Sequence, residues 1–166
     1  LSGEKYKDKR NKRNFFTKNN DYVIEEYSAK KHKKGCLNLL KKWTGQKIGL
    51  NENRNKLDAD IDANKKVFDF SRKLAVRGMV VLVYGKVVGY IFGKKINKKL
   101  CSMFVGKTAL NIKGLSPFIY SEFLRRYFKE CEHVNDGEDW NIDYLKNSKN
   151  SYKPQTVMNS YSLVES

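Results

Sequence analysis

Three neighbouring runs decide the fold of this chain: Met79-Val-Val-Leu-Val-Tyr84, Val87-Val-Gly-Tyr-Ile-Phe92 and Leu100-Cys-Ser-Met-Phe-Val105. Each run is rich in β-branched and aromatic residues, which favour strands. Gly85 and Asn97 lie in the short connections, where they supply the backbone freedom that tight turns need. The sequence therefore predicts three strands joined as an antiparallel meander.

Four elements are predicted before the meander. Residues 7–18 combine the apolar pair Phe15-Phe16 with basic residues around most of the circumference, which indicates a short basic helix. Residues 22–27 form a strand-like run. Apolar residues recur at helical spacing over 35–43 and again over 57–74, so two further helices are expected.

The segment after the meander predicts a helix, a strand, a helix and a strand in that order. Ser116 and Pro117 open the first helix as its N-cap and first helical residue, and the apolar spacing continues to about Cys131. The remaining strand, helix and strand are expected over residues 133–135, 143–148 and 156–164. Together these elements indicate one α+β domain.

Length and composition restrict the class of protein. The chain has 166 residues, of which 40% are hydrophobic and 31% charged, as expected of one folded domain and not of a disordered segment. No apolar run approaches the roughly 18 residues that a membrane-spanning helix needs, and no secretory signal is visible. Because the chain begins with Leu1 and not Met, we expect a fragment or a processed form of a longer protein.

The cysteines and histidines favour a reducing cytosol. Three scattered cysteines with no CxxC pair argue against disulfides and against a structural zinc site. All three lie in apolar patterns and are expected to be small core residues, and neither histidine has a partner at a suggestive spacing. These residues are Cys36, Cys101, Cys131, His32 and His133.

The formal net charge is +16, and it is concentrated near the start of the chain. Residues 1–48 hold fourteen Lys or Arg and five Asp or Glu, a net charge of +9. A surplus of this size favours an anionic partner, such as tRNA, a phosphorylated cofactor or an acidic lipid headgroup. The alternative is a surface rich in lysine that serves only solubility.

The end of the chain carries a specific motif. Residues 134–154 read Val-Asn-Asp-Gly-Glu-Asp-Trp-Asn-Ile-Asp-Tyr-Leu-Lys-Asn-Ser-Lys-Asn-Ser-Tyr-Lys-Pro. This string resembles the closing signature of the phosphatidylglycerol lysyltransferase C-terminal domain family, in which an Asn, an Asp four residues later and a Lys-x-Ser-Tyr-x-Pro ending recur. Further matches to the family are Lys107, Gly114 and the run Lys9-Arg10-Asn11, so the resemblance covers nearly the whole chain.

The resemblance implies a GNAT-like acyltransferase fold, with residues 1–20 as a basic helix or linker and residues 21–166 as the GNAT-like domain. Family members often have a second, preceding half, so the chain is expected to be the C-terminal half of a two-half architecture. This sequence departs from the family pattern at Gly106, where the family has Glu, and at Asp136 and Asn141. These departures concern the activity more than the fold.

The connection between the meander and the following helix is a candidate anion site. GNAT enzymes bind a cofactor pyrophosphate on backbone amides at this location, where the helix dipole also attracts anions. Lys107, Lys113, Gly114 and Ser116 are the candidate cofactor-binding residues. The usual glycine-rich loop of acetyl-CoA users is absent, which favours a tRNA phosphate or an acidic headgroup over acyl-CoA. The alternative is an ordinary capped helix.

The closing motif supplies the candidate catalytic residues. Asp139 could hold an ammonium group or take a proton, Lys149 could stabilise an oxyanion, and Tyr152 could protonate a leaving group. Candidate substrate-binding residues are Asn135, Ser151, Lys9, Arg10 and Asn11. The alternative is a structural corner in which Lys149 and Asp139 form an ion pair.

Aromatic residues of the meander and the following helix are expected in the core and not on a nucleic-acid stacking surface. They are Tyr84, Tyr90, Phe92, Phe104 and Phe118.

The predicted function is transfer of an acyl or aminoacyl group, with aminoacyl-tRNA as the preferred donor and an amine or hydroxyl as the acceptor. The rival hypothesis is a GNAT-fold module that binds RNA or an acidic surface without catalysis. No metal is expected. We expect a cytoplasmic protein that could dock on the surface of an anionic membrane.

Overall fold

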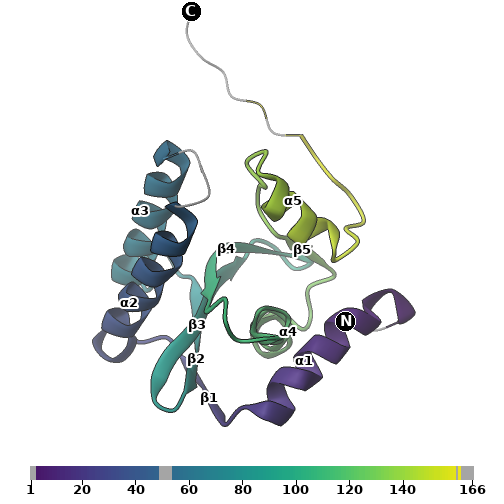
Figure 1. The fold of residues 1–166 in the computed structure, drawn as a ribbon. Helices are drawn as coiled ribbons and strands as arrows, with labels where there is room; N and C mark the ends of the chain where they lie inside the picture. The colour runs from purple at the N-terminus through teal and green to yellow at the C-terminus, as the bar shows by residue number, and fades with distance from the viewer. Residues whose placement is uncertain (1–2, 49–53, 160, 162–166) are drawn as a thin grey trace, which may run out of the picture.

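A computed structural model describes residues 3–48, 54–159 and 161. Five strands form one sheet in the order in which they occur in the chain (Figure 1). Neighbouring strands are antiparallel through the fourth strand, and the fifth runs parallel to the fourth. The strands are β1 (Tyr22–Glu26), β2 (Arg77–Val83), β3 (Lys86–Lys95), β4 (Leu100–Thr108) and β5 (His133–Asn135). The predicted meander is confirmed as β2, β3 and β4.

Helices cover both faces of the sheet. The helices α2 and α3 lie on one face, and α1 and α4 lie on the other (Figure 1). A short 3-10 helix, η1 (Glu4–Tyr6), precedes α1, and α5 lies beside β5. The helices are α1 (Lys7–Asn19), α2 (Ala29–Ile48), α3 (Arg54–Phe70), α4 (Leu115–Tyr127) and α5 (Asp143–Asn150).

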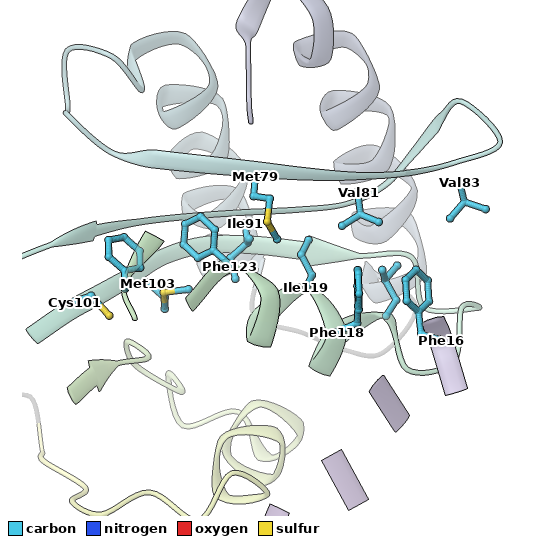
Figure 2. Close-up of a cluster of buried hydrophobic side chains, with 12 residues drawn as sticks. Phe16, Met79, Val81, Val83, Ile91, Cys101, Met103, Phe118, Ile119 and Phe123 are labelled. Carbon is cyan, nitrogen blue, oxygen red and sulfur yellow. The ribbon is translucent and has the colours of Figure 1, made fainter. Parts of the chain in front are cut away.

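One hydrophobic cluster fills the space between the sheet and α4. Figure 2 shows side chains of β2, β3 and β4 pointing toward Phe118, Ile119 and Phe123 of α4. Phe16 of α1 joins this cluster and is completely buried, because its ring packs 4.5 Å from the Phe118 ring. The predicted basic helix is thus confirmed, and its apolar side contributes to the core. The proposed domain division at residue 20 stays a prediction.

A second cluster lies on the opposite face, under α2 and α3. Phe68, Tyr90 and Phe92 are completely buried, and the rings of Phe68 and Tyr90 meet edge to face at 5.0 Å. The prediction of buried aromatic residues is confirmed for Tyr90, Phe92 and Phe118. It is wrong for Tyr84, which is 83% exposed at the β2–β3 turn, and for Phe104, which is 48% exposed on β4.

The start of α4 differs from the prediction. The N-cap is Gly114, which has a left-handed backbone with φ of 82°, and Ser116 and Pro117 are the second and third helical residues. A Cβ atom at position 114 would collide with the carbonyl oxygen of Lys12 on α1. A glycine is therefore needed both for the backbone angle and for the close approach of α1.

A last strand is predicted over residues 156–164. In the described part of this segment, residues 156–159 and 161, no strand forms. Residues 156–159 are exposed and have no strand partner, and the side chains of Val157 and Met158 are 74% and 82% exposed. Position 160 and positions 162–166 lie outside the described residues. An apolar alternation predicts a strand only if a sheet edge lies beside it, and here β5 has only three residues.

Two other predictions concern His32 and the cysteines. His32 is not incidental, because it is 2% exposed and both of its ring nitrogens are bonded. Its Nδ1 accepts the Ser28 N–H at 2.9 Å, so Nε2 carries the proton and donates to Glu25 Oε2 at 2.8 Å. Cys36 and Cys101 are buried as predicted, whereas Cys131 is only partly buried.

Candidate functional site

A cleft of about 490 Å³ lies between β4 and the segment that contains α5. It exists because β5 pairs with β4 only at Leu100 to Ser102, which leaves residues 103–108 of β4 without a neighbouring strand on that side among the described residues. The N-terminal part of α4 closes one side. Polar groups that line the cleft are Asp60, Ser102, Lys107, Thr108, Ser116, Tyr120, Asp136, Glu138, Ser148, Lys149 and Tyr152.

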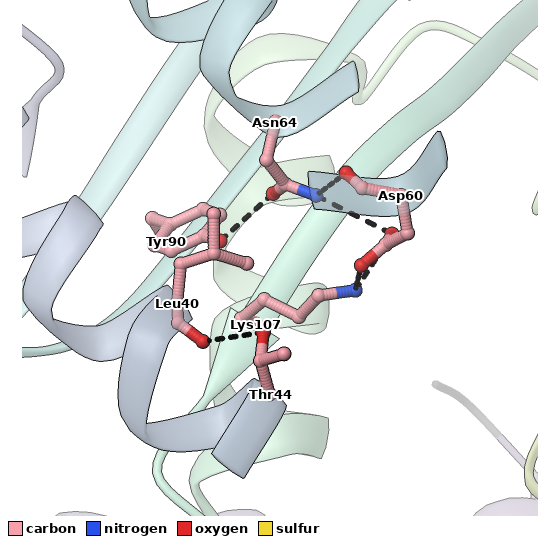
Figure 3. A network of polar contacts seen from close by, with 6 residues as sticks. All are labelled: Leu40, Thr44, Asp60, Asn64, Tyr90 and Lys107. Atoms are coloured by element: carbon pink, nitrogen blue, oxygen red, sulfur yellow. Dashed lines mark hydrogen bonds and ion pairs between the residues drawn. The ribbon is translucent and has the colours of Figure 1, made fainter. Parts of the chain in front are cut away.

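The wall formed by α3 and β3 contains a chain of buried hydrogen bonds. Figure 3 shows Tyr90, Asn64 and Asp60 in sequence along this chain. The Tyr90 hydroxyl donates to Asn64 Oδ1 at 2.8 Å, and Asn64 Nδ2 donates to the backbone oxygen of Asp60 at 2.7 Å and to its Oδ1 at 3.3 Å. Tyr90 and Asn64 are completely buried, so these bonds fix the Asp60 side chain from inside the core.

Lys107 of β4 completes this wall. Its Nζ donates to Asp60 Oδ1 at 3.0 Å and lies 2.9 Å from Asp60 Oδ2 (Figure 3). The same ammonium lies 4.2 Å from the centre of the Trp43 ring, which is a cation–π contact. The two paired side chains are 11% and 15% exposed. Lys107 is therefore neutralised by Asp60 and is not a free cation for an anionic ligand.

The wall formed by α5 and the preceding loop holds a second polar cluster. Lys149 Nζ lies 3.3 Å from Asp136 Oδ2 and also donates to the Asp136 backbone oxygen. The rings of Tyr120 and Tyr152 are 5.2 Å apart. Burial raises the pKa of both tyrosines, and the charge of Asp136 raises the pKa further in each case. Both hydroxyls are therefore protonated at neutral pH.

Helix α1 reaches this second wall from the far end of the sequence. Lys9 Nζ donates to Ser151 Oγ at 2.6 Å and lies 4.2 Å from the centre of the Tyr152 ring. Burial lowers the pKa of Lys9, and nearby Lys12 lowers it further. Three predicted site residues are thus in direct contact, although Lys9 and Ser151 are 142 positions apart.

The predicted site residues do not all meet at the cleft. Lys149, Tyr152, Lys107 and Ser116 line it, whereas Asp139 and Asn135 do not. The carboxylate of Asp139 accepts the Asn141 N–H, and the Asn135 side chain accepts the Gly137 N–H, so both shape the loop before α5. The predicted ion pair of Lys149 with Asp139 is wrong, because Lys149 pairs with Asp136.

The remaining predicted residues lie along α1 and the start of α4. Lys113 lies over the Phe15 ring at 4.7 Å, Gly114 is packed against α1, and Arg10 donates to the backbone oxygen of Gly3. Asn11 is exposed. The four candidate cofactor-binding residues are therefore divided between the cleft, which Lys107 and Ser116 line, and the contact between α1 and α4.

The sequence does not predict several residues of the cleft and of the buried wall behind it. Asp60 and Asn64 are four positions apart and so share one face of a helix, which is a signal for a hydrogen-bonded pair. The sequence marks Asp136 only as a departure from the family pattern. Nothing local to Trp140 indicates that it lines both the cleft and a smaller side pocket of about 40 Å³, which share Asp60 and Lys107.

The family model for the phosphatidylglycerol lysyltransferase C-terminal domain matches residues 1–164. The domain that holds the cleft has a fold of the GNAT acyltransferase type. The chain belongs to the phosphatidylglycerol lysyltransferase C-terminal family. A search of curated protein sequences found no match.

Solved structures agree with this assignment. A conserved protein of unknown function from Bacteroides thetaiotaomicron is 27% identical with a TM-score of 0.84, and the alignment covers 95% of this chain and 52% of that one. The C-terminal domain of a candidate lysylphosphatidylglycerol synthetase from Agrobacterium fabrum is 13% identical with a TM-score of 0.57, over 93% of this chain and 53% of that one. This chain therefore spans about half the length of both structures.

A shorter protein shows the same fold. The structure of a possible acetyltransferase from Clostridium difficile is 15% identical with a TM-score of 0.51, and the alignment covers 87% of this chain and 99% of that one. At this level of identity the likeness concerns the fold alone. In the part of the chain that the structure describes, no helix has both the length and the apolar composition needed to cross a membrane.

Proposed function

We propose that this chain is a transfer domain that moves an aminoacyl or acyl group to an amine or hydroxyl acceptor, with aminoacyl-tRNA as donor. One observation carries the proposal: Lys149, Tyr120 and Tyr152 line a cleft beside the part of β4 that has no neighbouring strand on that side among the described residues. An unpaired strand edge offers free N–H and C=O groups that can hold an extended substrate. Membership of the lysyltransferase C-terminal family supports the reaction class.

The side chains of the α5 wall suit attack on an acyl ester. The acceptor oxygen or nitrogen would form a bond to the acyl carbon, and the bond from that carbon to the donor oxygen would break. Lys149 could stabilise the negative charge that develops on the carbonyl oxygen. Tyr152, protonated at neutral pH, could donate a hydrogen bond to the departing donor oxygen, which finally takes up the proton of the acceptor.

The charge distribution supports an anionic donor whose phosphates stay outside the cleft. Each lysine that lines the cleft is paired with a carboxylate, Lys107 with Asp60 and Lys149 with Asp136. The chain nevertheless has a formal net charge of +16. We therefore propose that the exposed basic surface contacts tRNA phosphates, or the headgroups of an acidic membrane, on the cytoplasmic side.

A binding module without catalysis is the second candidate. It is favoured by Gly106, which stands in the cleft where the family has Glu, and by the neutralised lysines. Such a module would bind RNA with strong salt dependence and would turn over no donor.

One experiment separates the two candidates. The full-length protein is incubated with a set of charged tRNAs, and deacylation is followed with and without candidate amine and hydroxyl acceptors. Acceptor-dependent deacylation supports transfer, whereas salt-sensitive RNA binding with no turnover supports the binding module.

A pair of variants tests which carboxylate serves the reaction. Asp136→Asn removes the carboxylate that faces Lys149, and Asp139→Asn removes the one proposed from the sequence. If Asp136 is the active group, its variant should lose about tenfold to a hundredfold in transfer rate and Asp139→Asn should lose less. The opposite ranking, with both melting temperatures unchanged, would restore Asp139 as the catalytic candidate.

A further inference from the structure

Lys9 differs from the neighbouring lysines of α1 in its partners. Lys7 and Lys12 pair with the local carboxylates of Glu4 and Asp8, at 3.1 Å and 2.8 Å. Lys9 makes no ion pair within the described ranges and instead contacts Ser151 and Tyr152. An ammonium that is partly buried without a carboxylate needs other compensation. The hydroxyl of Ser151 and the face of the Tyr152 ring supply it, in addition to the charge of Asp8, which lies beyond ion-pair distance.

The segment that Lys9 contacts has little packing of its own. No residue of α5 is buried, and β5 pairs with β4 at only three positions. The position of Tyr152 therefore depends on a small number of side-chain contacts. Within the described residues, Tyr152 has a tilted ring contact with Tyr120, and Lys9 adds a cation–π contact to Tyr152 and a hydrogen bond to its neighbour Ser151.

Helix α1 is a firm support for these contacts. Phe16, seven residues further along the same helix, is completely buried against Phe118, and Gly114 lets the backbone of α1 lie close to α4. A cation held on such a helix can fix a mobile aromatic ring, because both the hydrogen bond and the cation–π contact have a preferred geometry.

We infer that Lys9 is a positioning residue, which holds the Tyr152 ring against Tyr120 and so sets the shape of the cleft on the α5 side. This role replaces the contact between Lys9 and substrate that the sequence predicts. Its consequence for catalysis rests on the proposed transfer reaction, but the positioning itself does not.

Hydrogen exchange of the full-length protein tests the positioning directly. Lys9→Met keeps the apolar stem and removes the charge, Lys9→Arg restores a cation, and Ser151→Ala removes only the hydrogen bond. Lys5→Met is the matched control, because Lys5 also lies near the start of the chain and over a ring, but that ring is Tyr6, at 5.0 Å, and not Tyr152. Exchange of the amides of residues 143–152 should rise about threefold to tenfold in Lys9→Met. It should rise less in Ser151→Ala and stay at the wild-type rate in Lys9→Arg and Lys5→Met.

Transfer kinetics then separate positioning from substrate contact. A positioning role predicts that Lys9→Met lowers kcat about tenfold with little change in KM, and that Lys9→Arg recovers most of the rate. A raised KM, a weaker salt dependence of binding and unchanged exchange would overturn the inference, because these are the signs of a direct phosphate contact.

The two proposals fail in different ways. If no variant and no wild-type protein transfers an acyl group, the proposed function fails, and the exchange result still decides the role of Lys9. If Lys9→Met exchanges like the wild-type protein, the inference about Lys9 is wrong whatever the activity.

Discussion

The two walls of the cleft are built in opposite ways. On the α3 side, Asn64 and Tyr90 are completely buried and hold Asp60 and Lys107 through a continuous series of hydrogen bonds. On the α5 side, the helix buries no residue and its polar groups are tied by a few partly exposed contacts. The comparison indicates that one wall is a fixed part of the core, whereas the other can be repositioned at small cost in free energy.

The largest expected effect comes from Asp60→Asn, which breaks the fixed wall. It leaves the Lys107 ammonium largely buried without its carboxylate, so the free energy of unfolding should fall by about 3 kcal/mol in urea titrations. Asp62→Asn, an exposed position of the same helix, should change it by less than about 0.5 kcal/mol. If the added variant Asp60→Asn/Lys107→Met is no more stable than Asp60→Asn, the loss does not come from the stranded charge.

Asn64→Leu should have the next largest effect. It removes the amide that bonds both Tyr90 and Asp60, and the stranded hydroxyl should lower the unfolding free energy by about 2 kcal/mol. Adding Tyr90→Phe removes the other partner and should recover part of this loss. Purely additive losses in the double variant would show that the hydrogen bond is not the source of the stability.

Gly114→Ala tests the support beneath the other wall. Alanine at a φ of 82° is strained, and its Cβ would push against the carbonyl of Lys12, so a loss of about 2 kcal/mol and displacement of α1 are expected. Gly45→Ala is the control, since nothing lies within 4 Å of a Cβ there, and it should stabilise α2 by up to about 1 kcal/mol. Faster exchange at residues 143–152 in Gly114→Ala alone would sharpen the comparison, because it would show that α1 supports α5.

The smallest effect is a dependence on alkaline pH. Burial raises the pKa of Tyr152 above the ordinary value of 10.0, so the folded state keeps this proton at a pH where the unfolded state loses it. The resulting stabilisation is complete below pH 10 and is lost as pH rises toward the folded pKa. Tyr152→Phe should therefore show a shallower decline of melting temperature between pH 9 and pH 11 than the wild-type protein does.

The control for this titration is Tyr84→Phe, which removes an exposed hydroxyl. An equal decline in wild type and Tyr152→Phe would mean that the α5 wall already opens before Tyr152 ionises. Burial also raises the pKa of Tyr90, so the same melting-temperature titration of Tyr90→Phe gives the corresponding measurement for the α3 wall.

Much of the fold could be predicted because its signals are local. The meander of β2, β3 and β4 follows from runs of β-branched and aromatic residues, α2 and α3 follow from apolar spacing, and α1 follows from an apolar pair on an otherwise basic segment. The errors arose where a local pattern competes with a distant partner. The Ser-Pro pattern at 116–117 suggested a helix start, but the approach of α1 placed the cap at Gly114.

The sequence by itself determined the order of helices and strands as far as α5, the core aromatics of β3 and α4, and the family, which the closing motif indicates. Only the tertiary structure decided which polar groups meet. Lys107 pairs with Asp60 across 47 positions, Lys9 meets Ser151 across 142, and Lys149 pairs with Asp136 and not with Asp139. Residue type and spacing limit which groups a side chain can bond. Its actual partner depends on how distant segments pack together, and no local sequence pattern encodes that packing.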